Sequence, residues 1–322
     1  MQSKRHIGES GFTLIEILIA LTIMTLITVI VLGALAPWLT FKQAQDTDRK
    51  LQDLRQGLTA YYDTNAMAID TDAAGNFGLF TTSVQASGTC APQPAGFQSI
   101  SSLISESGQM ALRDGFGNDW CIFVSQPLFE TRDGTSIWYR NIAIVSPGKN
   151  SLIEPGTGLD GQGKLTTAGD DRGIVINGFN IEYAKYKELT TRLTRISSMY
   201  ETYFTTRFLA SANRDITVDY FNSKFDSGNG VPPTNGKWSD ASAFLAGVGI
   251  LPNDTLTPWD ALNTISNSIQ IGNTSETVNG ATVRSPDSTG IGVLPYTSLI
   301  RAQLPAPPGQ TLYVVRSIVG NY

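Results

Sequence analysis

The chain begins with a short charged segment and then runs through an almost uninterrupted apolar stretch. Residues 17–36 contain no charged side chain, and a helix of this length spans about 30 Å, the hydrocarbon thickness of a bilayer. From residue 43 to 67, apolar residues recur at steps of three and four, which predicts an amphipathic helix packed on a sheet. The two stretches predict one helix of roughly 50 residues, half in a membrane and half on a globular body. We expect Gly33 and Pro37 to weaken it.

Two polar features interrupt the apolar stretch. Glu16 places a carboxylate near its start, and an ionisable group at the centre of a membrane span costs roughly 2.5–3.5 kcal/mol or more. We therefore expect Glu16 to have a function. Thr22, Thr25 and Thr28 recur every three residues and fall near one side of the helix. Small polar residues help helices to approach each other in lipid, whereas helix threonines also bond their own backbone; the spacing slightly favours a packing face.

A second amphipathic helix is predicted at residues 181–210, and it repeats the first one. A shift of 142 positions places Leu51 on Leu193, Leu54 on Ile196, Leu58 on Tyr200, Tyr61 on Tyr203 and Tyr62 on Phe204. A shift of 143 places Phe116, in a turn at 114–120, on Trp259 in a second turn. Two landmarks at nearly the same offset favour an internal duplication.

Strands are predicted around both helices. In the first half they are residues 121–124 and a pair at 136–140 and 141–145. In the second half the predicted strands are residues 265–271, 282–284, 292–295 and 312–319. The predicted fold class is therefore α+β: a long N-terminal hydrophobic α-helix packed on an antiparallel β-sheet head, followed by a second such head that lacks a membrane segment.

Composition narrows the functional classes. The 322 residues have a formal net charge of −5, which gives no electrostatic reason to expect specific nucleic-acid binding. The only histidine, His6, precedes the apolar stretch, so the rest of the chain cannot use a Ser-His or Cys-His mechanism or a His-ligated zinc. We do not expect an enzyme.

The residues at the start of the apolar stretch resemble the class III signal of type IV prepilins. Gly11 is followed by Phe12-Thr13-Leu14-Ile15-Glu16, behind a basic head. The resemblance implies that a prepilin peptidase cuts between Gly11 and Phe12 and that the new amino group of Phe12 is methylated. The helix is then retained, first as an anchor and later as filament core. A plain single-pass anchor is the alternative, but the five-residue match favours the pilin-like interpretation.

The same resemblance suggests a task for Glu16. We expect it to pair with the Phe12 amine of a neighbouring subunit and so to set the axial register, because either charge left unpaired in a filament core is costly. The basic leader would stay in the cytoplasm and the body would be exported. Cys90 and Cys121 would then form one disulfide closing a loop of about 30 residues, worth about 3 kcal/mol. Two buried free thiols are the alternative.

Two loops resemble those of type II secretion pseudopilins. Residues 114–120 are similar to their Asp-Pro-Trp-Gly-Asn turn, with Gly115 and Phe116 in place of Pro and Trp, and residues 146–150 are similar to their Ser-Pro-Gly loop. Major pseudopilins bind calcium in a Gly- and Asp-rich loop nearby, which implies Asp160, Asp170 and Asp171 as candidate ligands. Three carboxylates are few for a cation that takes six to eight oxygens, and Gly-Asp loops are also ordinary turns. No other cofactor is expected.

The predicted organisation is a cleaved leader at 1–11, a transmembrane and filament-core helix at 12–38, and pilin-like globular domains at 39–175 and 176–322. We expect a minor pilin or pilin-like subunit, anchored in the bacterial inner membrane by one span. Its exported body would then enter a periplasmic or cell-surface filament, where it initiates assembly or occupies the tip. Expected partners are the prepilin peptidase, other pilin or pseudopilin subunits, the inner-membrane assembly platform and membrane lipid.

Two alternatives stay open. One is an adhesin or ligand-binding module mounted on a filament or membrane, with the loops at 226–237 and 273–282 as its recognition surface. The other is a type II secretion pseudopilin.

Overall fold

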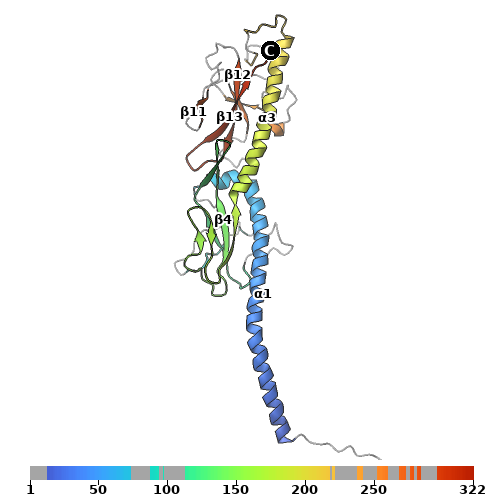
Figure 1. Cartoon of the computed structure of the whole chain (residues 1–322), viewed down its shortest axis with the longest axis vertical. Coiled ribbons are helices and arrows are strands. Elements are labelled where there is room, and N and C mark those ends of the chain that lie inside the picture. The colour runs from blue at the N-terminus through green and yellow to red at the C-terminus, as the bar shows by residue number, and fades with distance from the viewer. Residues whose placement is uncertain are drawn as a thin grey trace, which may run out of the picture.

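Two long helices organise the computed structural model, α1 (Leu14–Thr71) and α3 (Gly178–Ala210). The structure describes residues 13–73, 88–93, 97, 113–217, 220–221, 238–241, 252–259, 268–272, 276–278, 281–283 and 296–322. The N-terminal half of α1 projects from one end of the molecule, and α3 continues upward from the level where α1 ends (Figure 1). We call residues 14–41 of α1 the stem.

The helix α1 is longer and more regular than predicted. It runs through Gly33 and Pro37 without a break, and its non-helical residue is Asn65, with φ −114° and ψ 20°. The structure shows no break at Gly33 or Pro37, and the weakening expected there stays a prediction. A proline in a helix removes one backbone hydrogen bond, and the flanking residues of high helix propensity continue the helix. At Asn65 the side-chain amide donates to the Tyr61 carbonyl at 2.9 Å, which competes with the backbone ladder.

The apolar faces of both helices are buried as their periodicity predicts. Most of the residues that the 142-residue shift brings together are at most 2 % exposed: Leu51, Leu54, Leu58 and Tyr62 on α1, and Leu193, Ile196, Tyr200 and Phe204 on α3. The remaining pair, Tyr61 and Tyr203, is partly buried. Burying such side chains contributes about 1.5–3 kcal/mol each, so these faces hold both helices against their sheets.

The first sheet has three antiparallel strands in the order β1-β4-β7: Cys121–Val124, Asn141–Ser146 and Arg172–Asn177. Two hairpins extend from it, β2–β3 (Leu128–Arg132, Thr135–Tyr139) and β5–β6 (Gly158–Leu159, Leu165–Thr166). The predicted pairing of 136–140 with 141–145 was wrong, because β3 pairs with β2 while β4 lies between β1 and β7. Only Arg140 separates β3 from β4, and a tight hairpin needs two loop residues.

The second sheet has the order β13-β12-β9-β8: Leu312–Val319, Thr297–Leu304, Gln270–Gly272 and Trp238–Asp240. A separate pair, β10–β11 (Glu276–Val278, Ala281–Val283), lies beside β13, and the short helix η4 (Pro252–Thr255) contacts α3. The strand predicted at 312–319 is confirmed, whereas β12 was not predicted. The predicted strand at 292–295 and the start of that at 265–271 lie outside the described residues.

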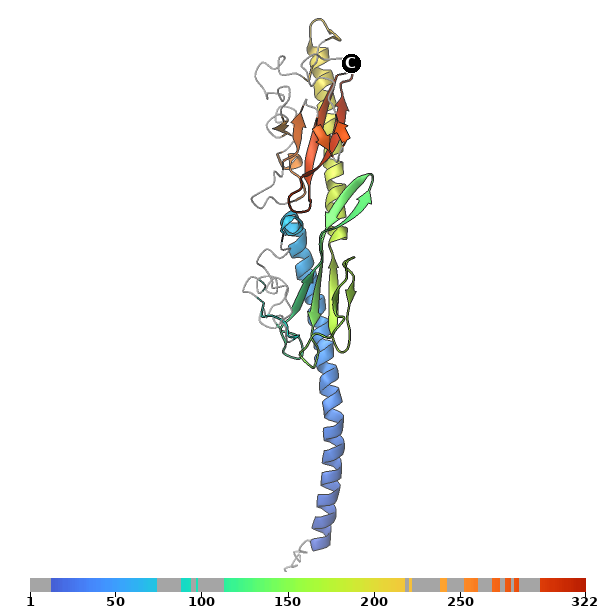
Figure 2. The same cartoon turned by 90° about the vertical axis from the view of Figure 1, so that its left-hand side faces the viewer.

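The two sheets lie one above the other along the long axis of the molecule (Figures 1 and 2). We call α1 from residue 44 onward with β1–β7 the first unit, and α3 with β8–β13 the second unit. In each unit the helix contacts the last strand of the sheet, α1 against β7 and α3 against β13. The second unit lies at the end opposite the stem, so the molecule is a rod in which stem, first unit and second unit follow each other.

Candidate functional site

The stem begins with a self-contained cap built around Glu16. The Thr13 backbone N–H and hydroxyl both donate to Glu16 Oε2 at 2.9 Å, and the Glu16 N–H donates to Thr13 Oγ1 at 3.4 Å. This reciprocal arrangement is a capping box, which satisfies N–H groups that have no partner within the helix. In the isolated chain the Glu16 carboxylate therefore has hydrogen bonds from its own chain. Its expected partner, Phe12, lies outside the described residues, as does Gly11.

The rest of the stem presents apolar side chains on all sides. Every described stem residue up to Leu39 is exposed, including Ile17, Leu26 and Trp38. The hydroxyls of Thr22, Thr25 and Thr28 donate to the carbonyls of Leu18, Leu21 and Met24 at 2.7–3.0 Å. Among the described residues, α1 is the one helix long and apolar enough to cross a membrane. Its uncovered surface requires either lipid or other apolar helices around it.

The two loops that resemble pseudopilin motifs lie against each other where α1 enters the first unit. Asp114, at 2 % exposure, accepts the Phe116 and Asn118 N–H groups at 2.9 and 2.7 Å and the Ser146 hydroxyl at 2.6 Å. Asn118 Nδ2 donates to the Gly148 carbonyl at 2.6 Å. The turn also contacts the helix, because the Gly115 N–H donates to Thr47 Oγ1 at 2.9 Å. A Cβ on Gly115 would lie 2.0 Å from the Gln43 carbonyl oxygen, so the glycine that replaces proline permits this close approach.

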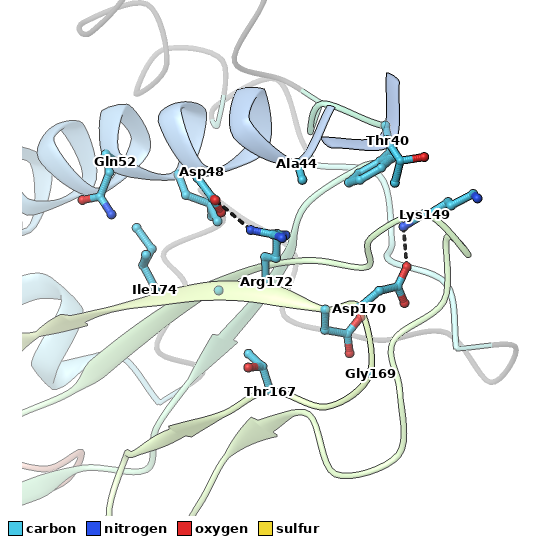
Figure 3. Close-up of a pocket in the computed structure, with 14 residues that line it drawn as sticks. Thr40, Ala44, Asp48, Gln52, Lys149, Thr167, Gly169, Asp170, Arg172 and Ile174 are labelled. Atoms are coloured by element: carbon cyan, nitrogen blue, oxygen red, sulfur yellow. Dashed lines mark hydrogen bonds and ion pairs between the residues drawn. The ribbon is translucent and has the colours of Figure 1, made fainter. Parts of the chain in front are cut away.

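A groove of about 580 Å³ lies between α1 and the loops at this end of the first sheet. Figure 3 shows Asp48 on α1 facing Arg172 on β7, and the ion pair between Asp48 Oδ2 and Arg172 Nη1 measures 2.7 Å. On the far wall the Lys149 backbone N–H donates to Asp170 Oδ2 at 2.6 Å. The groove opens beside the last exposed turns of the stem, where a neighbouring helix packed on the stem would meet the first unit.

The three aspartates considered for calcium are not brought together. Asp160 closes its own turn by accepting the N–H groups of Gln162 and Lys164, and Asp170 accepts those of Lys149 and Asn150. Asp171 accepts the Glu154 N–H and the Thr157 hydroxyl. In the part of the chain that the structure describes, no group of three His, Cys, Asp or Glu side chains could hold a metal ion. The structure therefore gives the calcium prediction no support, because these carboxylates bond their own loops.

Cys90 and Cys121 are joined in a disulfide, as predicted, and the two positions are 31 residues apart. The bond fixes the segment at 88–93 to the start of β1. Gln93 Nε2 reinforces this by donating to the Trp120 carbonyl at 2.8 Å. Neither Cys90 nor Cys121 is a free thiol, so the alternative of two buried free thiols is excluded.

The family comparison decides what the stem is. Residues 8–32 match the family model for the prokaryotic N-terminal methylation motif. These residues include Gly11, Phe12 and the Glu16 cap described above. The chain carries a class III prepilin signal, the signal of type IV pilin-like proteins. Comparison with curated proteins gives no significant match, and neither does comparison with solved structures.

Several properties of the pilin-like protein follow from this signal. A class III prepilin signal implies processing by a prepilin peptidase and assembly with other pilins. The apolar helix and the motif together make the protein a membrane-anchored, single-pass protein with a pilin or pseudopilin-like role. The stem is thus its membrane anchor.

Sequence reasoning missed a buried polar group between the two units of the pilin-like protein. Tyr62 Oη donates to Asp70 Oδ1 at 2.5 Å, and Trp259 Nε1 donates to Glu182 Oε2 at 2.7 Å. Burial raises the pKa of Asp70 to about 7, against the hydrogen bond from Tyr62, and burial also raises the pKa of Glu182 well above its ordinary value. One signal was available: Glu182 stands four residues before Tyr186 on the apolar face of α3, where a carboxylate must find partners.

Proposed function

We propose that this pilin-like protein is a minor subunit that is placed at the tip of a type IV pilus or related filament and initiates its assembly. In this proposal the body is exported, the inner-membrane assembly platform adds the subunit to the filament, and the subunit has no catalytic role. The stem supplies the surface shared with the other subunits, and the second unit distinguishes this subunit from them.

The axial position of the second unit is the observation that carries the proposal. In a filament whose subunits pack through their stems, each subunit is displaced along the axis from the one before it, and heterologous contacts of this kind repeat without closing. The space beyond a head, on the side away from its stem, is then filled by the heads of neighbouring subunits. In this protein the second unit extends along the axis on the side opposite the stem (Figures 1 and 2). Such a subunit fits best where no other subunit lies beyond its head, which is the tip.

We further propose that the second unit arose by duplication of the first. The central strands follow chain order in both sheets, β1-β4-β7 and β9-β12-β13. One helix-to-turn contact also recurs: Lys50 Nζ donates to the Asp114 carbonyl at 3.3 Å, and Arg192 Nη1 donates to the Leu256 carbonyl at 2.7 Å. Donor and acceptor are 64 residues apart in both cases, and the two donors are related by the same 142-residue shift as the apolar faces. These contacts support two heads of one kind, of which only the first has a stem.

A type II secretion pseudopilin is the second candidate, and the contact between the loops at 114–120 and 146–150 favours it. The hydrogen bond from Ser146 to Asp114 joins the two segments that resemble pseudopilin motifs. A tip role is compatible with either filament, because the argument from axial packing does not depend on the secretion system.

Deletion of the gene tests the proposal. We expect loss of the protein to abolish or strongly reduce filaments in electron micrographs, and the full-length chain to restore them. The Glu16→Gln variant keeps the size of the side chain but removes the charge, and we expect it to remain in the membrane without restoring filaments. Filaments of normal number that have lost a binding activity would instead identify an adhesin. Filaments of normal number and normal binding would refute a role in initiation.

A further inference from the structure

We propose that the two units are joined through a single proton shared by Asp70 and Glu182, and that the joint loosens when alkaline pH removes this proton. We call these two residues the carboxyl pair. The carboxyl pair would join the units in this way wherever the subunit sits in a filament.

The carboxyl pair is the centre of a chain of hydrogen bonds that crosses from the first unit to the second. In the first unit the Arg140 backbone N–H donates to Tyr62 Oη at 3.0 Å, and Tyr62 donates in turn to Asp70 Oδ1. From the second unit, Trp259 donates to Glu182 Oε2. Asp70 and Glu182 lie within hydrogen-bonding reach of each other, so the pair closes the chain.

The remaining oxygens locate the proton. Asp70 Oδ2 and Glu182 Oε1 are both buried, and neither has a donor among the described residues. Two carboxylates can only accept hydrogen bonds, so one of these oxygens must bear a proton for either to be satisfied. Asp70 Oδ1 already accepts the short bond from Tyr62, which favours the ionised form of Asp70. The geometry therefore assigns the proton to Glu182 Oε1, from which it is donated to Asp70 Oδ2.

The charges around the pair agree with one proton. Arg140, at 3 % exposure, faces Asp70 from the link between β3 and β4, and its guanidinium also donates to the Ser125 and Asp72 carbonyls at 3.0 and 2.8 Å. On α3, Lys185 faces Glu182 but forms an ion pair with Asp63 at 3.2 Å. Tyr62 on α1 and Trp259 contribute no charge. Asp72, just after the end of α1, also acts on Arg140 but is only partly buried. The one buried cation thus balances one buried anion, and a second buried carboxylate charge would be left uncompensated.

The space beside the carboxyl pair is at the lower limit for one water. The cavity beside Glu182 measures about 10 Å³ and is lined largely by apolar side chains of both units, including Ile137, Trp138 and Leu304. A buried water needs at least this much space and two to four polar partners. When Glu182 ionises, two negative oxygens face each other in an apolar setting, and separation of the units is the way to hydrate them.

The test uses the full chain in detergent micelles and two isosteric variants. In Glu182→Gln the amide nitrogen donates to Asp70 Oδ2 at every pH and the amide oxygen still accepts from Trp259. In Asp70→Asn the amide donates to Glu182, so Glu182 can ionise without losing its bond. We expect the infrared carbonyl band of a protonated carboxylic acid in the wild-type protein at about pH 7 and its absence from both variants. No such band in the wild type, or a band that survives in Glu182→Gln, would overturn the assignment.

The effect on the joint is read by trypsin cleavage after Lys185 and Lys187, at the start of α3. The ratio of the wild-type rate to the Glu182→Gln rate at the same pH cancels the pH dependence of the protease. We expect a ratio near one at about pH 6 and at least a fivefold excess at about pH 9, because only the wild type loses its proton. A ratio that does not change with pH would refute the pH-sensitive joint, even if the infrared band is present.

Discussion

The turn held by Asp114 offers a sharp test of how the first unit is built. Asp114 and Asp160 are both turn aspartates that accept two backbone N–H groups, at 2.7–2.9 Å and 2.8–2.9 Å. They differ in burial, because Asp114 is 2 % exposed and Asp160 is exposed. Asp114 also accepts the hydroxyl of Ser146, which is fully buried. The comparison of Asp114→Ala with Asp160→Ala therefore separates the effect of burial from the loss of turn hydrogen bonds.

The expected magnitudes follow from what each variant leaves unpaired. Each buried donor that loses its acceptor costs about 1–3 kcal/mol, while an exposed one bonds to water. Asp114→Ala leaves two partly buried N–H groups and one buried hydroxyl without their acceptor, so we expect a loss of about 3 kcal/mol. We expect Asp160→Ala to cost less than about 1 kcal/mol. Asp114→Asn keeps an accepting oxygen and should fall between them.

Thermal unfolding of the full chain in detergent measures the difference. A loss of about 3 kcal/mol corresponds to a fall in the melting temperature of roughly 10 °C for a unit of this size. The melting temperature of Asp160→Ala should stay within a few degrees of the wild-type value. Equal shifts for Asp114→Ala and Asp160→Ala would refute the reasoning, since burial would then not determine the cost.

Three further predictions use the same assay. Gly178→Ala should lower stability by about 1–3 kcal/mol, because its Cβ would lie 2.2 Å from the Arg140 carbonyl oxygen. Gly161→Ala should change stability little, because no atom lies within 4 Å of its Cβ. Similar effects of the two variants would contradict the close approach at Gly178. Replacing Cys90 and Cys121 together by serine should cost about 3 kcal/mol, and a reductant should then change the melting temperature of the wild type but not of the variant. Burial raises the pKa of Asp70 from 3.8 to about 7 and that of Glu182 well above its ordinary value, so the carboxyl pair retains in the folded protein a proton that the unfolded chain releases. Stability should therefore fall as pH rises through the window from 3.8 to about 7; stability that increases between these pH values would show that the sign is wrong.

The elements that could be predicted from the sequence are those specified by local pattern. The buried faces of α1 and α3 follow from apolar residues at steps of three and four, and the Glu16 motif follows from consecutive residues. The pairing of β3 with β2 could not be predicted in the same way, because it depends on the single residue between β3 and β4. The long β12 was missed although Arg301 and Gln303 alternate with the buried Ile300, Ala302 and Leu304. The residue that departs from this alternation is Ser298, a polar side chain on the buried face.

The candidate site shows the same division. Asp114 and Ser146 are 32 positions apart, and only a resemblance indicated that their loops belong together. Asp160, Asp170 and Asp171 looked like a ligand set in sequence, but each side chain is turned to nearby backbone N–H groups. The Asp70–Glu182 pair escaped prediction because its partners come from both helices, the β3–β4 link and the turn at Trp259. Periodicity specifies which face of a helix is buried, whereas long-range contacts determine which polar side chains can be tolerated there.

The position of the protein in the filament tests the central claim most directly. Filaments sheared from cells can be labelled with gold-conjugated antibodies against the full chain and examined by electron microscopy. A tip subunit predicts gold at one end of each filament and none along the shaft. Gold spaced regularly along the shaft would contradict the account, because a second unit that extends beyond the first would then have to fit between successive subunits.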